Sequence, residues 1–471
     1  MMKRSITMLL ALIMLLALTM SGCGSAPATS GQEASVSASD AEDASAGAAD
    51  VAATTPDNSP FTIKTTIQTN ELSKEQIAEF EKENPNLKVE IVTADNTKLM
   101  AMLAAGNPVD VIRTTGISAV PTLVTRELCL PLDSYLDKST VIKKDDFTAV
   151  QALYQFDGQN QGSGPVYGFA KDWSIDTTLW INKKIFRDAG VEIPSADKAL
   201  TASELADLAK KLTKKENGKI TVFGYVPTVN TDAIAINLAS IGKSLWSADM
   251  KTSSFSSPEA KSMLQYYVDL RKEGCIPSSI NPLSDGWGGA DFMDDKIAIY
   301  QTGYWYGGMI RTNDKIKDRM GDFAMLPSPI WDGGKVMPAV TGGTGAVVYS
   351  KTKNPDAVWK FMEYYFAGKP ADERASSGWG LPSFKSKMSM IPAATDFDKA
   401  VNAVNDKEVA LADLSLIKMN KFAPETSTDP ILTKYLDPVI YDKATLDDAV
   451  KQIDTDISSI IADGMDVAGV E

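Results

Sequence analysis

The stretch that decides the fold is FTIKTTIQTNELSKEQIAEFEKENPNLKVEIVTADNTKLMAMLAAGNPVDVIRTTG, residues 61–116. Apolar and polar residues alternate at its start, which predicts a strand over 61–67. Ser73-Lys74-Glu75-Gln76 is a capping box, so a helix should begin there and end before Pro85. Strands and helices that alternate in this way favour parallel pairing with right-handed crossovers. The next elements are predicted as a strand over 87–92, a helix over 97–105 closed by Gly106, and a strand over 109–112.

Polar residues follow each of these three strands. The strand ends are Thr69-Asn70, Asp95-Asn96 and Thr114-Thr115-Gly116. Open parallel sheets bind ligands beyond the carboxyl ends of their strands. The three polar ends fit that rule, although loops are polar in general.

The rest of the chain continues the α/β pattern. Residues 61–471 are more than one hydrophobic core usually supports, so two domains are expected. The sequence holds no second apolar stretch long enough to cross a membrane. Helices are predicted from the cap at Thr201, from Ser257-Pro258 to Gly274, from Asn354-Pro355 to Gly368, and over 446–461.

Composition excludes several kinds of chemistry. The chain has 471 residues, a net charge of −14, three cysteines and no histidine. Without imidazole there is no Ser-His-Asp or Cys-His nucleophile and no histidine-ligated zinc, and three cysteines cannot supply a four-thiolate metal site. The acidic balance argues against nucleic acid as a partner. No cofactor and no metal site are predicted.

The first 60 residues are interpreted as targeting and tether segments. Lys3 and Arg4 precede an apolar run over 6–18, which is short for a bilayer span but suits a secretory signal over 1–22. The run leads to Met20-Ser21-Gly22-Cys23, which resembles the lipobox of bacterial lipoproteins. In that family the peptide is cut before the cysteine, whose thiol then carries lipid; a plain signal peptide with a chance cysteine is the alternative. Beyond Cys23, residues 24–60 contain no Lys, Arg or aromatic residue and are expected to be a disordered acidic tether.

The two remaining cysteines leave two possibilities open. Cys129 and Cys275 both lie in apolar surroundings. An oxidising compartment would permit a disulfide between them, and two buried free thiols are equally compatible with the sequence.

Four loops place tryptophan beside glycine or aspartate. An indole plane packs on the apolar face of a sugar ring, neighbouring carboxylates and amides bind its hydroxyls, and glycines let the backbone approach. The alternative for any one of these tryptophans is that it fills a gap in the core. The loops are Asp172-Trp173, Asp285-Gly286-Trp287-Gly288-Gly289, Gly303-Tyr304-Trp305-Tyr306-Gly307-Gly308 and Gly378-Trp379-Gly380.

A family resemblance rests on several of these motifs taken in order. The stretch Tyr167-Gly168-Phe169-Ala170-Lys171-Asp172-Trp173, followed by Trp180-Ile181-Asn182-Lys183-Lys184-Ile185-Phe186, resembles the signature of family 1 extracellular solute-binding proteins. Residues 83–89, 105–111 and 292–305 extend the resemblance over essentially all of 61–471. These proteins are lipoprotein sugar receptors of ABC importers, similar to maltose-binding protein. Trp180 and Asp176 depart from the residues common in the family.

The resemblance implies an α/β, two-lobed periplasmic-binding-protein-like fold in which each lobe is a sheet flanked by helices and is discontinuous in sequence. On this basis 61–170 and about 296–340 are expected to form lobe 1, and 171–295 and about 341–471 lobe 2. By position, the implied ligand contacts are Asp172, Trp173, Asp285, Trp287, Asp291, Trp305 and Trp379, with Asn70, Asp95 and Thr115 from lobe 1.

The implied function is capture of a carbohydrate, favoured as an oligosaccharide because four aromatic loops offer more stacking area than one ring needs. The lobes would close on it and deliver it to the permease of an ABC importer. The receptor would be a monomer that is no enzyme, held by its lipid at the outer face of a bacterial cell membrane.

Three alternatives remain at this stage. A surface glycoside hydrolase would need two carboxylates held about 5–9.5 Å apart. The same fold could bind iron, polyamine or an acidic solute, and the pairs Tyr266-Tyr267 and Tyr364-Tyr365 superficially resemble ferric ligands, although their helical spacing favours core packing. The receptor could also serve a sensor kinase.

Overall fold

The computed structural model describes residues 59–94, 96–106, 108–341, 343–412 and 419–470. The predicted signal peptide, the predicted lipidation site Cys23, nearly all of the predicted tether and Asp95 lie outside the described residues. Within the described part of the chain, no helix is both long enough and apolar enough to span a bilayer.

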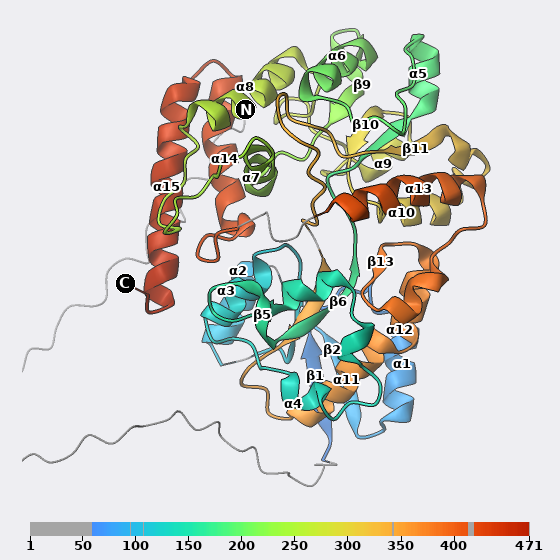
Figure 1. The fold of residues 1–471 in the computed structure, drawn as a ribbon, viewed down its shortest axis with the longest axis vertical. Helices are drawn as coiled ribbons and strands as arrows, with labels where there is room; N and C mark the ends of the chain where they lie inside the picture. The colour runs from blue at the N-terminus through green and yellow to red at the C-terminus, as the bar shows by residue number, and fades with distance from the viewer. Residues whose placement is uncertain (1–58, 95, 107, 342, 413–418, 471) are drawn as a thin grey trace, which may run out of the picture. The chain divides into compact units, whose positions relative to one another are not determined.

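One sheet is built on the stretch 61–116 and has six strands (Figure 1). In sheet order they are β13 (Leu381–Pro382), β6 (Gly168–Trp173), β12 (Thr344–Val348), β3 (Val111–Thr114), β1 (Phe61–Thr65) and β2 (Leu87–Ile91). β1 runs parallel to β2 and β3, which confirms the pairing predicted for this stretch. β12 is antiparallel to both β3 and β6. We call this sheet and its helices the first lobe.

A second sheet has five strands. In order they are β11 (Phe323–Leu326), β7 (Leu179–Asn182), β10 (Ile297–Gln301), β9 (Lys219–Val226) and β8 (Lys214–Glu216). β7 is antiparallel to β10 and β11, whereas β10 and β9 are parallel. This sheet and its helices are called the second lobe. A separate ribbon pairs β4 (Gln155–Phe156) with β5 (Gln161–Val166).

The predicted lobe boundaries are wrong for the strands after residue 296. β10 and β11 were expected with residues 61–170, but both pair with β7 in the five-stranded sheet. β12 and β13 were expected in lobe 2, but both pair with β6 in the six-stranded sheet. A buried strand shows its apolar character in the sequence, whereas the sheet that it joins is set by contacts with strands far away in the chain.

The helices begin where the sequence places their caps. Capping boxes at Ser73 and Thr201 are present, Ser257 and Asn354 cap helices that have proline in the first turn, and Gly274 closes one of these with a left-handed φ of 74°. In the first lobe the helices are α1 (Lys74–Glu83), α2 (Asn96–Ala104), α3 (Ala119–Thr125), α4 (Asp133–Leu136), η1 (Lys144–Asp146), η2 (Ala149–Tyr154), α11 (Pro355–Ala367), α12 (Lys369–Ser377) and η4 (Lys385–Met390). In the second lobe they are α5 (Lys183–Ala189), α6 (Ala202–Leu212), α7 (Thr231–Ser240), α8 (Pro258–Glu273), α9 (Gly289–Met293), α10 (Tyr306–Thr312), η3 (Lys317–Asp322), α13 (Asp396–Leu411), α14 (Glu425–Ile440) and α15 (Leu446–Val467).

Each lobe has its own apolar core. In the first lobe, Phe80 of α1 and Phe361 of α11 pack beneath the sheet with ring centroids 5.5 Å apart. In the second lobe, α14 and α15 lie side by side, drawn in red in Figure 1, and pack with α7 and α8. Cys129 and Cys275 are buried free thiols, which settles the question that the sequence left open.

Candidate functional site

Three tryptophan rings stack in a row. Trp305 lies between Trp287 and Trp379, with ring centroids 6.1 Å apart and planes 24° apart in both pairs. Trp287 and Trp305 precede α9 and α10 in the second lobe, whereas Trp379 lies between α12 and β13 in the first lobe. The row therefore contains side chains from both lobes. Three of the four predicted aromatic-glycine loops contribute to it.

Asp285 holds the loop that carries Trp287. Its carboxylate accepts hydrogen bonds from the backbone N–H groups of Trp287 (3.1 Å), Gly288 (2.6 Å) and Ala290 (2.8 Å). The Trp287 ring lies over Gly289, where an added Cβ would come within 2.0 Å of the indole. Asp285 was predicted as a ligand contact; it is exposed, and because both of its oxygens bind the backbone of its own loop, it also positions Trp287.

Trp379 is fixed by contacts on both sides. Arg374 of α12 lies over its ring at 4.8 Å, and the backbone of Trp379 packs so closely on Gly308 of α10 that an added Cβ there would come within 2.9 Å of it. Asp172 accepts a 2.7 Å hydrogen bond from Nε of Arg374. Burial alone would lower the pKa of Arg374, but the charge and hydrogen bond of Asp172 together with the charges of Glu71 and Tyr365 outweigh it, and the pKa is raised. The pair keeps a cation against the Trp379 indole.

Three residues predicted as ligand contacts are buried, and the structure corrects them. Asp172 and Trp173 at the end of β6 are 5% and 7% exposed, and the Trp173 indole N–H donates to the carbonyl of Pro382. Asp291 in α9 is 3% exposed and accepts hydrogen bonds from Ser284 and Lys296. Burial would raise the pKa of Asp291, but these hydrogen bonds outweigh it and hold the pKa below its usual range. All three side chains have structural partners.

A cavity of about 440 Å³ opens beside two of the stacked indoles. Trp287 and Trp305 line it together with Tyr300, Gln301 and Thr302 at the end of β10, and Asp176 and Thr341 from the segments that join the two sheets. Trp287 is 42% exposed, which is unusual for so large an apolar side chain. The volume falls in the range of small-molecule binding sites.

Sequence reasoning missed most of the polar lining of this cavity. Asp176 gave a signal, because an acidic residue is unusual at that position of the family pattern. Its carboxylate accepts hydrogen bonds from Ser174 (2.6 Å) and the Thr341 N–H (2.9 Å), linking the two joining segments. Gln301 was not predicted as a contact, because the strand that it ends was expected in lobe 1, whereas it lies in the second lobe.

A second cavity, of about 250 Å³, lies at the carboxyl ends of β1, β2 and β3. Gln68, Ala94 and Thr115 follow these three strands and line it, as the rule for parallel sheets predicts. Thr115 was a predicted contact and is exposed. Asn70 is exposed in the turn after β1 but is not among the residues that line this cavity. Two arginines, Arg113 and Arg126, were missed and also line it.

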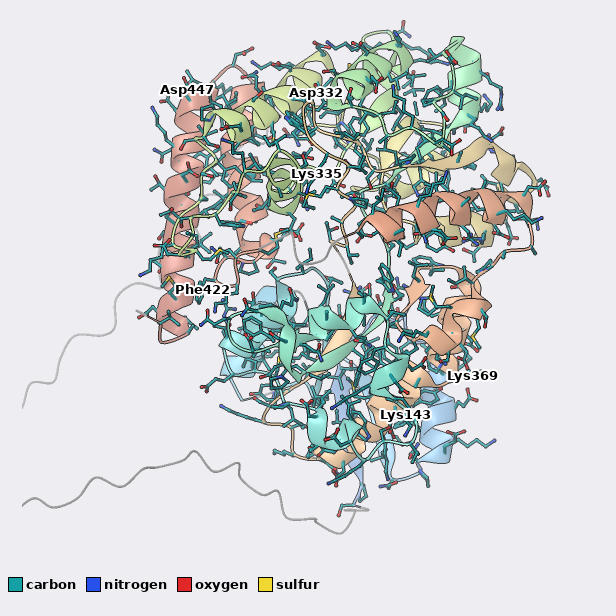
Figure 2. All side chains as sticks on the ribbon, in the orientation of Figure 1. Lys143, Asp332, Lys335, Lys369, Phe422 and Asp447 are labelled. Carbon is teal, nitrogen blue, oxygen red and sulfur yellow. The ribbon has the colours of Figure 1, made fainter. Side chains whose placement is uncertain are left out.

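The far wall of the second cavity comes from the second lobe. Pro424, Glu425 and Thr426 at the start of α14 form it. The preceding segment reaches the first lobe, because Thr122 donates its hydroxyl to the Lys421 carbonyl (2.9 Å) and the Lys421 ammonium donates to the Gly158 carbonyl (2.7 Å). The next residue, Phe422, is labelled in Figure 2 and is buried against Gly464 of α15.

Glu425 belongs to a group of three acids, of which Asp232 is buried and Glu425 and Asp429 are half-buried. Asn230 at the start of α7 donates its amide N–H to Glu425, and the Thr231 N–H donates to Asp429 at 3.0 Å. Burial, together with the neighbouring Asp429, raises the pKa of Glu425 to about 7. Burial also raises the pKa of Asp429 and that of Asp232. At neutral pH the group carries less negative charge than three free carboxylates would.

The tyrosine pairs do not form a ferric site. Tyr266 donates its hydroxyl to the Ala202 carbonyl (3.0 Å), and Tyr364 donates to the Gln76 carbonyl (2.8 Å). Burial raises the pKa of Tyr267 and Tyr364 to about 12, which disfavours the phenolate that iron would require. The described residues also contain no group of three or more acidic or cysteine side chains placed to hold a metal ion.

Two helix-flanked sheets, joined by more than one segment and bordered by a tryptophan-lined cavity, define an α/β binding protein. The family model for bacterial extracellular solute-binding proteins matches residues 65–369. The chain therefore belongs to the family of bacterial extracellular solute-binding proteins.

One relative and two solved structures resemble this chain at low sequence identity. An arabinooligosaccharide-binding protein of Halalkalibacterium halodurans is 24% identical over 226 residues, which are 47% of this chain and 47% of that protein, so the match spans about half of the relative's length. An ABC substrate-binding protein from Listeria monocytogenes in complex with cycloalternan has a TM-score of 0.69 at 21% identity, over 87% of this chain and 98% of that one. A solute-binding protein of an ABC transporter from Thermotoga lettingae, bound to α-D-tagatose, has a TM-score of 0.67 at 20% identity, over 85% and 99% of the two chains. These structures share the fold, which is the two-lobed α/β fold predicted from the sequence.

Proposed function

We propose that this chain is an extracellular receptor that captures a carbohydrate, specifically an oligosaccharide, and passes it to an ABC importer. The observation that carries the proposal is the row of three indoles, two of which line the 440 Å³ cavity. Indole faces cover the apolar faces of sugar rings, and a row of them offers more stacking area than a monosaccharide uses. The ligands named for the relatives are carbohydrates as well, among them arabinooligosaccharide and cycloalternan.

Each wall of the site has its own task in this proposal. Trp287 stacks on a sugar ring, Trp305 lines the cavity beside it, and Trp379 extends the row toward the first lobe. Gln301 and Thr302 at the end of β10 bind hydroxyls, and Thr115, Asn70 and Asp95 are proposed to add polar contacts from the first lobe. Asp285 positions the Trp287 ring by binding the backbone of its loop. The ion pair of Asp172 and Arg374 positions the Trp379 ring.

Lobe closure is proposed as the signal to the importer. Two segments join the sheets directly, between β6 and β7 and between β11 and β12, and the chain crosses again between η4 and α13. A ligand held by both lobes binds the closed form better than the open form and so shifts the balance toward closure. A permease can then distinguish the filled receptor from the empty one.

The anchor is proposed from the sequence. Residues 1–22 act as a signal peptide, Cys23 carries lipid and residues 24–60 tether the folded part to the outer face of the cell membrane. Incorporation of a labelled fatty acid into the wild-type protein, and its loss in Cys23→Ser, would test this assignment. Labelling that persists in Cys23→Ser would contradict it.

A thermal-shift screen against mono- and oligosaccharides tests the binding function. Ligands that bind the native state raise the melting temperature according to ln(1 + [L]/Kd). We expect oligosaccharides to give larger shifts than their component monosaccharides, and chromatography of each mixture to recover the sugar unchanged. A panel without any shift would refute carbohydrate binding, and appearance of shorter sugars would identify an enzyme.

A further inference from the structure

Every arginine that the structure describes, except Arg126, lies close to a carboxylate. Arg113, Arg187, Arg311, Arg319 and Arg374 each form an ion pair with a carboxylate, and Arg271 lies close enough to Asp437 for that charge to raise its pKa. Arg126 has no ion pair and no side-chain hydrogen bond to another described residue. Burial lowers the pKa of Arg126, and no described carboxylate offsets that effect.

Arg126 faces the cavity at the strand ends rather than the core. It follows α3 and lines the 250 Å³ cavity. Arg271 Nε and Arg311 Nη2 are buried and make no hydrogen bond within the described residues. No nitrogen of Arg126 is buried in this way. A half-buried guanidinium without a counter-charge costs free energy that an anionic group in the cavity would recover.

Some of the other polar groups of this cavity already make hydrogen bonds within the protein, and others make none to a described group. Arg113 donates two hydrogen bonds to Glu71 at 2.7 and 2.6 Å, so its charge is already balanced. Thr114 bonds Tyr154, and Thr122 donates to Lys421. The hydroxyls of Ser118 and Thr115 and the amide of Gln68 make no hydrogen bond to a described side chain or backbone group. Together with Arg126 they form a set of donors at one wall.

We propose that this cavity binds an anionic substituent of the carbohydrate, with Arg126 as its charge partner and Ser118, Thr115 and Gln68 as hydrogen-bond donors. The inference rests on the proposed carbohydrate function and specifies its ligand class, an acidic rather than a neutral oligosaccharide. A carboxylate of a uronic acid residue and a sulfate ester each place one negative charge and at least two acceptor oxygens before the guanidinium fork, and both meet this requirement.

The opposite wall is compatible with an anion. Glu425 lines it and accepts a hydrogen bond from Asn230. With its pKa raised to about 7, Glu425 is protonated in a substantial fraction of molecules at neutral pH and repels an anion less than an ordinary carboxylate does. Asp429 and Asp232, on the helices that meet there, also have raised pKa values.

Calorimetric titration of matched oligosaccharides tests the proposal. Three ligands of equal length are compared: a neutral one, the same chain ending in a uronic acid, and the same chain with one sulfate ester. The wild type should bind at least one charged ligand about ten- to a hundredfold more tightly than the neutral ligand, which is the range of one charge-assisted hydrogen-bonded pair. The better of the two charged ligands identifies the anion.

Variants at two arginines test whether Arg126 causes the preference for charged ligands. Arg126→Gln should lose the preference and keep the affinity for the neutral ligand, Arg126→Lys should keep part of the preference, and Arg271→Gln, an arginine in another cavity, should keep all of it. Because Arg126→Gln could lose stability, the salt dependence of the wild-type preference gives a second measurement, and it should fall as NaCl is raised.

Failure of this inference is distinguishable from failure of the proposed function. Equal wild-type affinity for charged and neutral ligands, a preference that survives in folded Arg126→Gln, or a preference insensitive to salt would overturn the role of Arg126 while leaving carbohydrate binding intact. If none of the three ligands bound, the carbohydrate function itself would fail.

Discussion

Replacing Trp287 by alanine should weaken carbohydrate binding in a protein that still folds. Trp287 is 42% exposed. An indole side chain presents roughly 200 Å², so roughly 80 Å² remains for a ligand to cover. At about 25 cal/mol per Å² that area is worth about 2 kcal/mol when it is fully covered. Because 1.4 kcal/mol corresponds to a factor of ten, Kd should rise by about 10- to 30-fold.

The measurement is calorimetric titration with the tightest oligosaccharide from the thermal-shift screen. The remaining roughly 120 Å² of the indole packs on neighbours that include Trp305, Tyr306 and Gly289, and its removal should lower the free energy of unfolding by about 3 kcal/mol. A folded protein is typically stable by about 5–15 kcal/mol, so the variant should stay folded. Ile280→Ala is the matched control, because Ile280 is an exposed apolar residue of the same connecting segment and lies outside the indole row. A Kd within twofold of wild type in folded Trp287→Ala would refute the role given to the exposed indole.

Three other predictions follow from the supports of the row and from the buried acids. Gly289→Ala places a Cβ against the Trp287 ring and should raise Kd about as much as Trp287→Ala does. The control is Gly321→Ala, whose added Cβ meets nothing within 4 Å and which should leave the calorimetric affinity unchanged. Equal effects of the two variants would contradict the contact between Gly289 and the Trp287 ring. Asp172→Asn leaves the Arg374 charge buried without its partner and should lower the free energy of unfolding by about 3–5 kcal/mol in urea titrations, and a loss below 1 kcal/mol would contradict the buried pair. The folded-state pKa of Glu425, about 7, lies above its ordinary value of 4.5, so its contribution to stability is fully present below pH 4.5 and is lost as the pH rises through 7. Glu425→Gln should therefore flatten the fall in unfolding free energy between pH 4.5 and 7, and an unchanged slope would show that Glu425 does not cause it.

The indole row shows how local and distant information combine. The sequence marks Trp287, Trp305 and Trp379 by their glycine neighbours, because a backbone that must approach a ring closely needs glycine. It marks Trp173 only by the neighbouring Asp172, and that indole is buried and hydrogen-bonded to Pro382. The two outcomes differ because Trp173 ends a strand inside the sheet, whereas Trp287 and Trp305 line a cavity and Trp379 stacks on Trp305.

The aspartates of the Trp287 loop also show that the sequence marks candidates whose hydrogen-bond partners only the structure reveals. Asp285 and Asp291 lie six positions apart in one loop-helix segment, and the sequence offers both as hydroxyl-binding groups. In the structure one binds its own loop backbone and the other binds Ser284 and Lys296. Whether a carboxylate is occupied depends on which donors reach it, and composition does not reveal that.

The sequence by itself determined the elements of this protein and its family pattern. Helix caps, alternating strands and the order of motifs act over a few residues, so 61–116 and the helices after Thr201, Ser257 and Asn354 are correctly predicted from local chemistry. Tertiary structure alone decided which sheet β10, β11, β12 and β13 join, and that Arg126 forms no ion pair with a described carboxylate. The physical reason is that strand pairing and charge balance are set between residues far apart in the chain, where no short-range pattern records them.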